Sequence, residues 1–251
     1  MFKLNHILYL IISFLIILLL LIFISKNKDE KKARIIRFIL GISLLITLII
    51  NRATLVHFNH VYYEPDNSLK PHHMFPNSWC SINALILSIY LIFDIKHHSI
   101  AFPIFLGIYG GMVASIIPTY LNKQPFFEID TLTSLLFHSI MILSCFTLLF
   151  TKYYIPHKLD FLYFGFGMLL LELIGFFQIH ALKYKESMQV GQPFFDSNPV
   201  ARVLTGPTVI IISATFLVAI VCILLNILEN RIKKSENYIN EAEIDNKSIN
   251  N

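Results

Sequence analysis

A cysteine and a histidine inside apolar segments are the residues of this chain whose types suit covalent chemistry. Cys80 begins an apolar segment shortly after Pro76, and His138 follows 58 positions later, well inside another apolar segment. Cysteine-dependent acyl transfer uses a thiol beside an imidazole, which takes the thiol proton. We therefore interpret Cys80 as a candidate nucleophile and His138 as its candidate base.

The segments that carry these residues have the length and composition of membrane helices. The chain has 251 residues, 55% hydrophobic and 14% charged, and a helix needs ~20 apolar residues to cross ~30 Å of hydrocarbon. The pattern predicts an all-α polytopic membrane protein with seven spans and almost nothing left over for a soluble domain. The expected spans are residues 5–24, 35–51, 79–95, 99–121, 131–151, 159–180 and 203–228.

Two regions follow from this division. We expect residues 1–228 to form a single transmembrane helical domain, with the first span retained as an anchor because no small-residue cleavage site follows it. Residues 229–251 are polar, rich in Asn, Lys and Glu, and lack an apolar stripe, which predicts a disordered cytoplasmic tail.

The Lys and Arg residues set the expected orientation. Of the 20, 13 fall on the face of the predicted bundle that carries the C-terminus, and seven fall on the other. Cytoplasmic loops carry the excess of positive charge, so we expect the N-terminus outside and the C-terminus in the cytoplasm. The net charge of +4 is then a topological signal, and no nucleic-acid partner is expected.

The abundance of Ile, Asn, Lys and Phe is typical of an AT-rich bacterial genome, which favours a bacterial plasma membrane.

Glu172 has the same expected depth as His138. His138 lies seven residues into its span, or ~10 Å deep, and Glu172 lies eight residues from the outer end of the sixth span. Ionisable groups so deep in hydrocarbon normally face the bundle interior and a partner. We expect a hydrogen bond in which Glu172 fixes the imidazole tautomer. Alternatively, the pair only aids helix packing and Cys80 is a small apolar residue.

The remaining cysteines and histidines have plainer interpretations. Cys145 lies on the same helical face as His138 and is an alternative partner for it, but ~10 Å deeper. Cys222 is interpreted as a core residue. No disulfide framework, metal or cofactor is expected, because the thiols lie at or in helices and no second His-x-x-His or thiolate completes a metal set. The loop histidines are interpreted as surface residues: His57, His60, His72 and His73.

Several short motifs resemble the YwaF-like family of bacterial integral membrane proteins. The likeness covers roughly residues 30–225. The family is similar to a mammalian multi-pass acyltransferase that moves fatty acyl groups between phospholipids, and more distantly to androgen-induced membrane hydrolases that use a threonine and a histidine. The motifs are Arg34-x-x-Arg37, Pro76-Asn-Ser-Trp-Cys80, Ile117-Pro118-Thr119, Phe137-His138 and Asn198-Pro199 with Pro207.

This resemblance implies that Cys80 is the acyl-accepting cysteine and His138 its histidine. The chain departs from the family pattern at Ser78, where a histidine is usual, and at Thr119, where an acidic residue is usual. No threonine of this chain is placed to favour the threonine-dependent chemistry of the androgen-induced hydrolases.

The function expected from the sequence is acyl transfer or hydrolysis on a phospholipid or other acyl lipid, through a thioester on Cys80. The developing oxyanion needs a donor, for which Asn77, Ser78 and Trp79 are candidates. Two alternatives remain open. In a small-solute transporter or binding component, His138 and Glu172 would form a proton relay or bind the solute, and glycines of the fourth span would let helices approach or bend. The other is a non-catalytic membrane scaffold.

Overall fold

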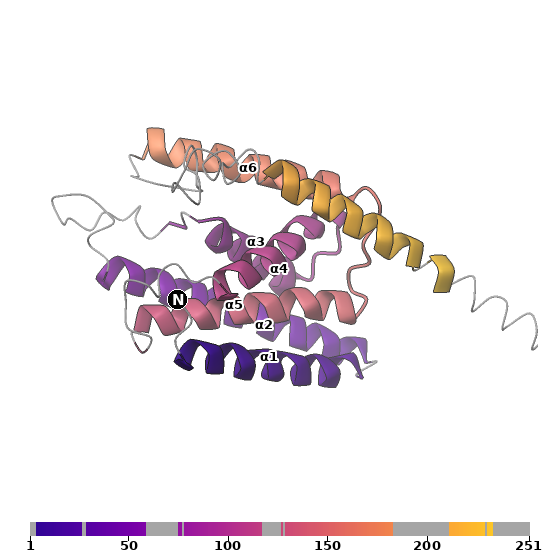
Figure 1. The fold of residues 1–251 in the computed structure, drawn as a ribbon, viewed down its shortest axis with the longest axis horizontal. Helices are drawn as coiled ribbons and strands as arrows, with labels where there is room; N and C mark the ends of the chain where they lie inside the picture. The colour runs from indigo at the N-terminus through magenta and orange to yellow at the C-terminus, as the bar shows by residue number, and fades with distance from the viewer. Residues whose placement is uncertain are drawn as a thin grey trace, which may run out of the picture.

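The computed structural model is an all-helical bundle, which confirms the predicted fold class (Figure 1). It describes residues 4–26, 29–58, 75–76, 78–116, 127, 129–182, 211–228 and 230–232. A short 3₁₀ helix, η3 (His98–Ile100), precedes α4. The other helices are α1 (Leu4–Ser25), α2 (Glu30–Phe58), α3 (Trp79–Phe93), α4 (Ala101–Ile116), α5 (Ile129–Phe150), α6 (Asp160–His180) and a last helix, Ile211–Ile232.

Six of these helices are long and apolar enough to cross a membrane, so the chain is a multi-pass membrane protein. The exception is α3, with 15 residues. The sequence predicts a span over residues 79–95, but the helix ends at Phe93 because Asp94 adopts the left-handed conformation, with φ 53°. The Asp94 carboxylate is held by arginine, as described below, so the chain leaves the helix early.

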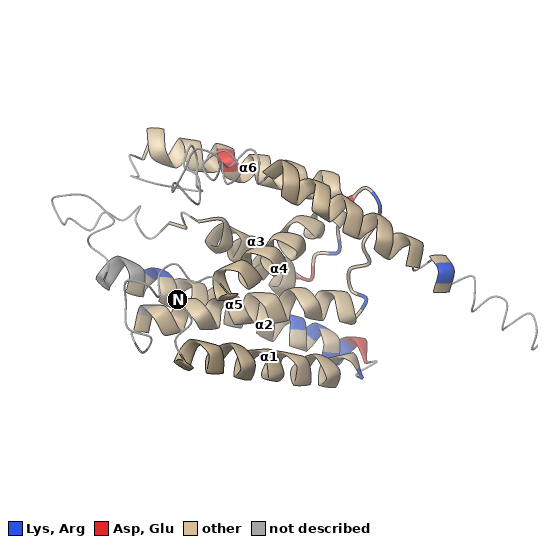
Figure 2. Cartoon of the chain, viewed as in Figure 1, with Lys and Arg blue, Asp and Glu red and all other residues tan. Residues whose placement is uncertain are grey.

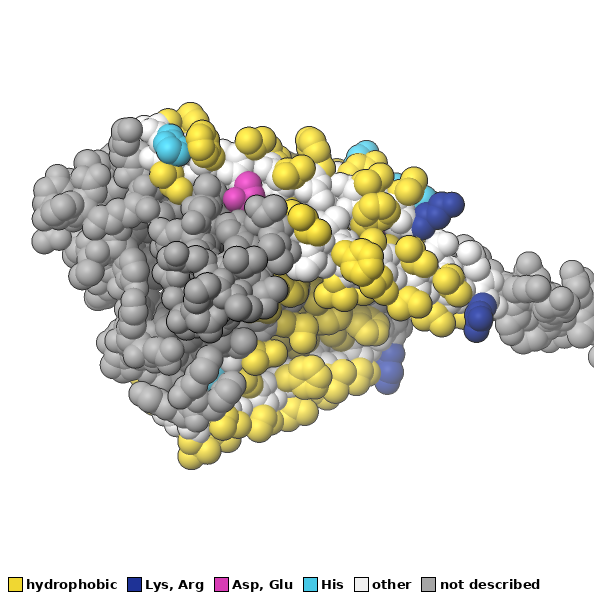
Figure 3. Space-filling model, turned by 45° about the horizontal axis from the view of Figure 1, so that its top comes forward, with side chains coloured by type: hydrophobic (Ala, Val, Ile, Leu, Met, Phe, Trp, Pro, Cys, Tyr) yellow, Lys and Arg dark blue, Asp and Glu magenta, His cyan; other side chains and the backbone are white. Residues whose placement is uncertain are grey.

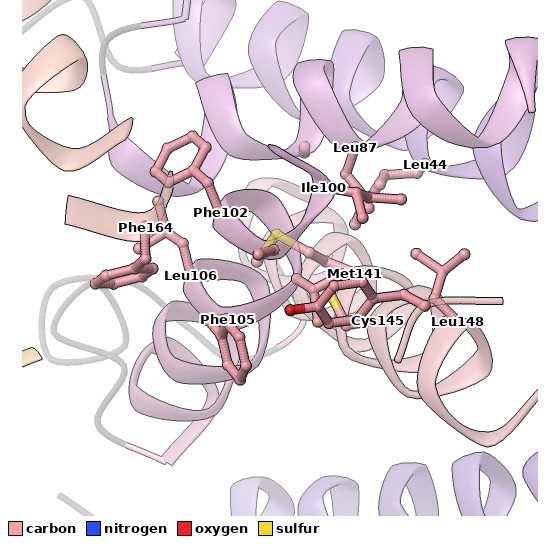
Figure 4. Close-up of a cluster of buried hydrophobic side chains, with 14 of the residues drawn as sticks. Leu44, Leu87, Ile100, Phe102, Phe105, Leu106, Met141, Cys145, Leu148 and Phe164 are labelled. Carbon is pink, nitrogen blue, oxygen red and sulfur yellow. The ribbon is translucent and has the colours of Figure 1, made fainter. Parts of the chain in front are cut away.

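The central helices enclose α4. Helix α4 packs against α3, α5 and α6, while α2 packs against both α3 and α5. Helix α1 lies along α5 at the edge of the bundle. Figure 4 shows the buried cluster to which α2, α3, α4 and α5 contribute, with Leu44, Leu87 and Met141 among its fully buried side chains. Hydrophobic side chains also cover much of the described outer surface, as expected for a protein surrounded by lipid (Figure 3).

Most described Lys and Arg residues lie toward one end of the bundle, the end at which α1 stops and α2 begins, and we call it the basic end (Figure 2). Here Arg37, which is 1% exposed, contacts Asp94 at 2.9 Å and Glu30 at 3.0 Å. Its guanidinium lies 4.1 Å from the centre of the Tyr153 ring. This cluster ties α2 to the end of α3 and to the connection between α5 and α6.

A second polar cluster at the basic end surrounds Asp160, which is 1% exposed. Its carboxylate accepts hydrogen bonds from the Tyr154 hydroxyl at 2.5 Å and from the His157 backbone N–H at 2.7 Å, and His98 Nδ1 lies 3.2 Å away. Burial, together with this carboxylate, raises the pKa of Tyr154, so the hydroxyl keeps its proton and donates. The cluster fixes the first residue of α6 to η3.

The opposite end of the bundle, which we call the thiol end, carries Cys80. Helices α3 and α5 both begin there, and α4 ends there. Some sequence predictions fall outside the described residues: His60, His72 and His73 of the histidine loop, Asn77, the motifs at 117–119 and 198–207, and most of the C-terminal tail. His57 was expected in that loop, but its backbone belongs to α2. The orientation of the bundle in the membrane stays a prediction.

Candidate functional site

The first turn of α3 is fixed by Ser78, which is the N-cap. Its backbone is extended, with φ −126° and ψ 154°, and its hydroxyl oxygen accepts a hydrogen bond from the Ser81 backbone N–H at 3.3 Å. The two serine hydroxyls also bond to each other. A serine at this position satisfies one of the unpaired N–H groups of a helix terminus. Ser78 therefore helps to place Cys80 in the first turn.

The Cys80 thiol packs against a glycine of α4. A Cβ atom added to Gly110 would lie 3.1 Å from Cys80 Sγ, closer than ordinary van der Waals contact. The sulfur therefore uses space that a side chain at position 110 would fill. Cys80 is half-buried and is a free thiol.

His138 has a defined tautomer. The residue is 6% exposed, and its Nδ1 lies 2.7 Å from the carbonyl oxygen of Ser134, one turn earlier in α5. A carbonyl oxygen only accepts, so Nδ1 must carry the proton. In the neutral imidazole this leaves Nε2 as the acceptor, which is the state that a general base needs.

Cys80 and His138 belong to one layer of the bundle. One turn deeper, Asn83 Nδ2 of α3 lies 3.6 Å from Met141 Sδ of α5. Cys80 precedes Asn83 by three residues and His138 precedes Met141 by three, and both helices begin at the thiol end. Cys80 and His138 therefore both lie one helical turn nearer the thiol end than the contact between Asn83 and Met141, and so at the same level as each other. Among the described residues, the thiol and the imidazole form no direct hydrogen bond, a common state for catalytic pairs without substrate.

The predicted hydrogen bond between His138 and Glu172 is not formed, and this sequence-based expectation was wrong. His138 bonds to Ser134 in its own helix, while the Glu172 carboxylate interacts with the Trp79 indole. The reason is the packing order: α4 contacts both α5 and α6 and keeps those two helices apart. Equal depth in two helices therefore did not make their side chains neighbours.

Helix α6 instead contacts the start of α3. Besides Glu172 and Trp79, the Gln178 side-chain amide donates a hydrogen bond to the Pro76 carbonyl at 2.9 Å. Gln178 is 2% exposed, so this bond lies in the protein interior. Gln178 thus fixes the segment that leads into Cys80 from one side.

The other two thiols lie away from this layer. Cys145 is fully buried against α4, where a Cβ atom on Gly107 would come within 2.5 Å of its sulfur. Its Sγ lies 3.8 Å from the Pro103 carbonyl oxygen. Cys222, in the last helix, is also fully buried. Both thiols are free and packed as core atoms.

Sequence reasoning missed the contribution of α1. His6 is 1% exposed, and its Nε2 lies 2.8 Å from the Ser115 carbonyl oxygen in the last turn of α4. The Tyr9 hydroxyl lies 2.7 Å from Ser139 Oγ, directly after His138. The available signal was the spacing of three residues, which places His6 and Tyr9 on one helical face. Helix α1 therefore places the polar side chains of His6 and Tyr9 at the level of the imidazole.

A second missed residue is Asn83, which is fully buried one turn after Cys80. Here too the three-residue spacing on one face was a readable signal. Among the described residues, no group of three or more His, Cys, Asp or Glu side chains is arranged to hold a metal ion. The site therefore consists of a thiol, an imidazole and a buried amide.

One comparison identifies a relationship for this chain. The family model that matches it is that of the TMEM164 family, over residues 1–225. The match includes α1 to α6 and most of the last helix, so it contains every residue of the candidate site. Comparisons with curated proteins and with solved structures give no match.

Proposed function

Because the chain belongs to the TMEM164 family of membrane proteins, we propose that it is a membrane-embedded lipid acyltransferase or lipid-ester hydrolase that acts through a thioester on Cys80. The observation that carries this proposal is the common layer of the thiol and the imidazole, with the acceptor nitrogen of His138 unprotonated. The YwaF-like resemblance supports the same roles for Cys80 and His138.

Acylation begins with proton transfer from the Cys80 thiol to His138 Nε2. The thiolate sulfur then forms a bond to the carbonyl carbon of a lipid ester, and the carbonyl electron pair moves onto oxygen. When this oxyanion collapses, the bond from carbon to the alcohol oxygen breaks, and the alcohol takes the proton from the imidazolium. The products are a free lipid alcohol and an acyl-thioester on Cys80.

Deacylation reverses the roles of the groups. A second lipid alcohol, or water, gives a proton to His138 Nε2 and attacks the thioester carbonyl. The thiolate leaves and recovers a proton from the imidazolium. An alcohol acceptor makes the protein a transferase, and water makes it a hydrolase.

The surroundings of Cys80 suit this chemistry. Cys80 lies in the first turn of α3 and is half-buried, whereas the thiols of Cys145 and Cys222 are fully buried. The apolar outer surface lets an acyl tail remain in the bilayer while its ester enters the bundle near α3. We assign Glu172 a positioning role, because its carboxylate interacts with the indole of Trp79, the residue directly before Cys80.

The proposed location is a bacterial plasma membrane, with the thiol end facing outward. The excess of Lys and Arg at the basic end supports this orientation. In this orientation the substrate is a lipid of the outer leaflet.

The deciding experiment is mass spectrometry of purified protein after incubation with phosphatidylcholine vesicles. We expect a fatty-acyl adduct on the peptide that contains Cys80, and no adduct in the Cys80→Ala variant. Cys145→Ala and Cys222→Ala are matched controls, since each removes a buried thiol outside the layer. Full lipid turnover by Cys80→Ala would overturn the proposal and favour the transporter or scaffold interpretation.

A further inference from the structure

Helix α4 carries a serine opposite His138. A Cβ atom on Gly111 of α4 would lie 2.7 Å from the Ile142 side chain of α5, so these two positions face each other. Helix α4 ends at the thiol end and α5 begins there. Four residues on from Gly111, one turn nearer that end, is Ser115. Four residues back from Ile142, also one turn nearer, is His138. Because residues four apart share a helical face, Ser115 and His138 face each other at one level.

The contacts of α1 support this placement. His6 Nε2 lies 2.8 Å from the Ser115 carbonyl oxygen. The Tyr9 hydroxyl lies 2.7 Å from Oγ of Ser139, which directly follows His138. His6 and Tyr9 are three residues apart, or about 4.5 Å along the axis of α1. The end of α4 and the turn of α5 that carries His138 therefore both lie against one turn of α1.

The Ser115 hydroxyl is buried and unused. Ser115 is 6% exposed, and its Oγ has no hydrogen-bond partner among the described residues. A helical serine can bond back to a carbonyl oxygen one turn earlier, as Ser88 does to Ala84 and Leu85. The Ser115 hydroxyl makes no such bond. An unpaired buried hydroxyl is costly, and a ligand that binds it removes this cost.

The imidazole has a matching unused group. His138 donates from Nδ1 to its own helix, and Nε2, the acceptor, forms no hydrogen bond within the described part of the chain. A hydroxyl donor and an imidazole acceptor thus face each other without a bond between them. A compound with an O–H group satisfies both, because it donates to Nε2 and accepts from the Ser115 hydroxyl. In the proposed reaction, such a compound is the alcohol or water that attacks the thioester.

We propose that Ser115 is a catalytic residue that holds the attacking alcohol or water against His138 Nε2 during deacylation. This inference rests on the proposed function, because it needs the acyl-thioester on Cys80. The O–H proton of the attacking compound passes to Nε2. Its oxygen forms a bond to the thioester carbonyl carbon, and the carbonyl electron pair moves onto oxygen. When that pair returns, the carbon–sulfur bond breaks and the thiolate takes the proton from the imidazolium. The Ser115 hydroxyl keeps its own proton and orients the attacking oxygen.

The test separates the two halves of the reaction. With p-nitrophenyl palmitate, the leaving group departs without protonation, so formation of the acyl-thioester needs no alcohol beside His138, whereas its breakdown does. We expect Ser115→Ala to leave the burst of p-nitrophenol within about twofold of wild type and to slow breakdown about tenfold, the effect of one lost hydrogen bond. Mass spectrometry of the Cys80 peptide follows breakdown in water and with lysophosphatidylcholine. Slowing with lysophosphatidylcholine alone assigns the site to a lipid alcohol, and slowing in both assigns it to water as well.

Ser144→Ala is the matched control, because Ser144 is a fully buried serine of α5 whose hydroxyl also has no partner among the described residues. It lies six residues, or about 9 Å, beyond His138 toward the basic end. We expect Ser144→Ala to change neither rate. Ser115→Thr, which keeps a hydroxyl, should break down its thioester faster than Ser115→Ala does.

Two results would overturn the inference. Equal slowing of the burst and of breakdown in Ser115→Ala would mean that Ser115 acts through packing or on the oxyanion. Unchanged breakdown, with a normal adduct on Cys80, would mean that the hydroxyl is not used, and it would leave the proposed function intact. If wild-type protein forms no acyl adduct on Cys80 but is alkylated there by iodoacetamide, the proposed function itself fails.

Discussion

The imidazole of His138 is oriented by its own helix. A carbonyl oxygen four residues earlier accepts from Nδ1, so no acidic side chain is needed to set the tautomer. A neutral carbonyl stabilises an imidazolium less than a carboxylate does. The orientation of the imidazole therefore does not depend on a side chain of another helix.

The roles of Cys80 and His138 are tested by their combination. We expect Cys80→Ala and His138→Ala each to abolish turnover of phosphatidylcholine, and the double variant to lose no more than either alone, because residues that act as a unit are non-additive. Cys80→Ser is a stricter variant, since an alcohol is a poorer nucleophile without strong base activation. Released fatty acid measures the turnover. Full activity in Cys80→Ser would contradict the role of the thiol.

The Gly110→Ala variant tests whether activity depends on the position of the Cys80 sulfur. A methyl group there would lie 3.1 Å from Cys80 Sγ, so Gly110→Ala should displace the sulfur and reduce turnover by at least about tenfold, as small misplacements of reacting groups do. The control is Gly165→Ala on α6, where the new methyl would lie 3.2 Å from the Thr215 methyl. The two variants have similar crowding, but only one is beside the thiol. Equal activities would show that the packing of Cys80 is unimportant.

At the scale of elements, α3 is fixed at both ends by polar contacts. The Ser78 cap and the contacts from α6 hold its start, and Asp94 is held at its end by Arg37. Along one side, Cys80 and Asn83 of α3 pack against Gly110 and Gly107 of α4. The helix that carries the proposed nucleophile is therefore held at its start, at its end and along one side.

The contact between Arg37 and Asp94 predicts a large effect on stability. Arg37→Met would leave a largely buried carboxylate without its main partner, and we expect a loss of about 3 kcal/mol in the free energy of unfolding. Arg34→Met is the control, because Arg34 is 71% exposed and lies 3.8 Å from the same carboxylate. It should cost less than about 1 kcal/mol. Unfolding in detergent measures both, and similar losses would contradict the assignment.

Most of the fold could be predicted from the sequence because apolar length is sufficient to find a membrane helix. Each of the seven predicted segments contains a helix. The short α3 could not be foreseen, since its end depends on Asp94 meeting an arginine 57 positions away. The membrane depth estimated from each residue's position in its predicted span placed Cys80 and His138 at one level. It did not reveal that α4 separates the helices of His138 and Glu172.

The buried polar residues were the least predictable part of the site. His6 and Asn83 look ordinary in sequence, because a single polar residue in an apolar helix carries no sign of which helix it will face. Their partners are carbonyl oxygens of α4, at Ser115 and Pro103. Backbone groups have no sequence signature, so such contacts require the structure.

At the scale of the whole molecule, charge divides the bundle into two ends. Of the ten described Lys and Arg residues, Arg52 alone lies at the thiol end. With the positive-inside rule this predicts that a tag in the loop between α2 and α3 is accessible from outside intact cells, and that a tag after Asn251 is not. Antibody labelling of intact and permeabilised cells measures this. The reverse pattern would place the thiol end in the cytoplasm.

The length of α3 has a consequence for the lipid around it. Its 15 residues span about 22 Å, against ~30 Å of hydrocarbon. The charged cluster around Asp94 keeps the other end of α3 near the headgroups, so the shortfall of roughly 8 Å lies above Cys80. An ester must sink by that distance, or the membrane must thin locally, as in hydrophobic mismatch. Bilayer thickness should therefore affect the rate of the proposed reaction. We expect faster turnover in vesicles of shorter-chain phosphatidylcholine, because the ester groups of a thinner bilayer lie closer to the sulfur.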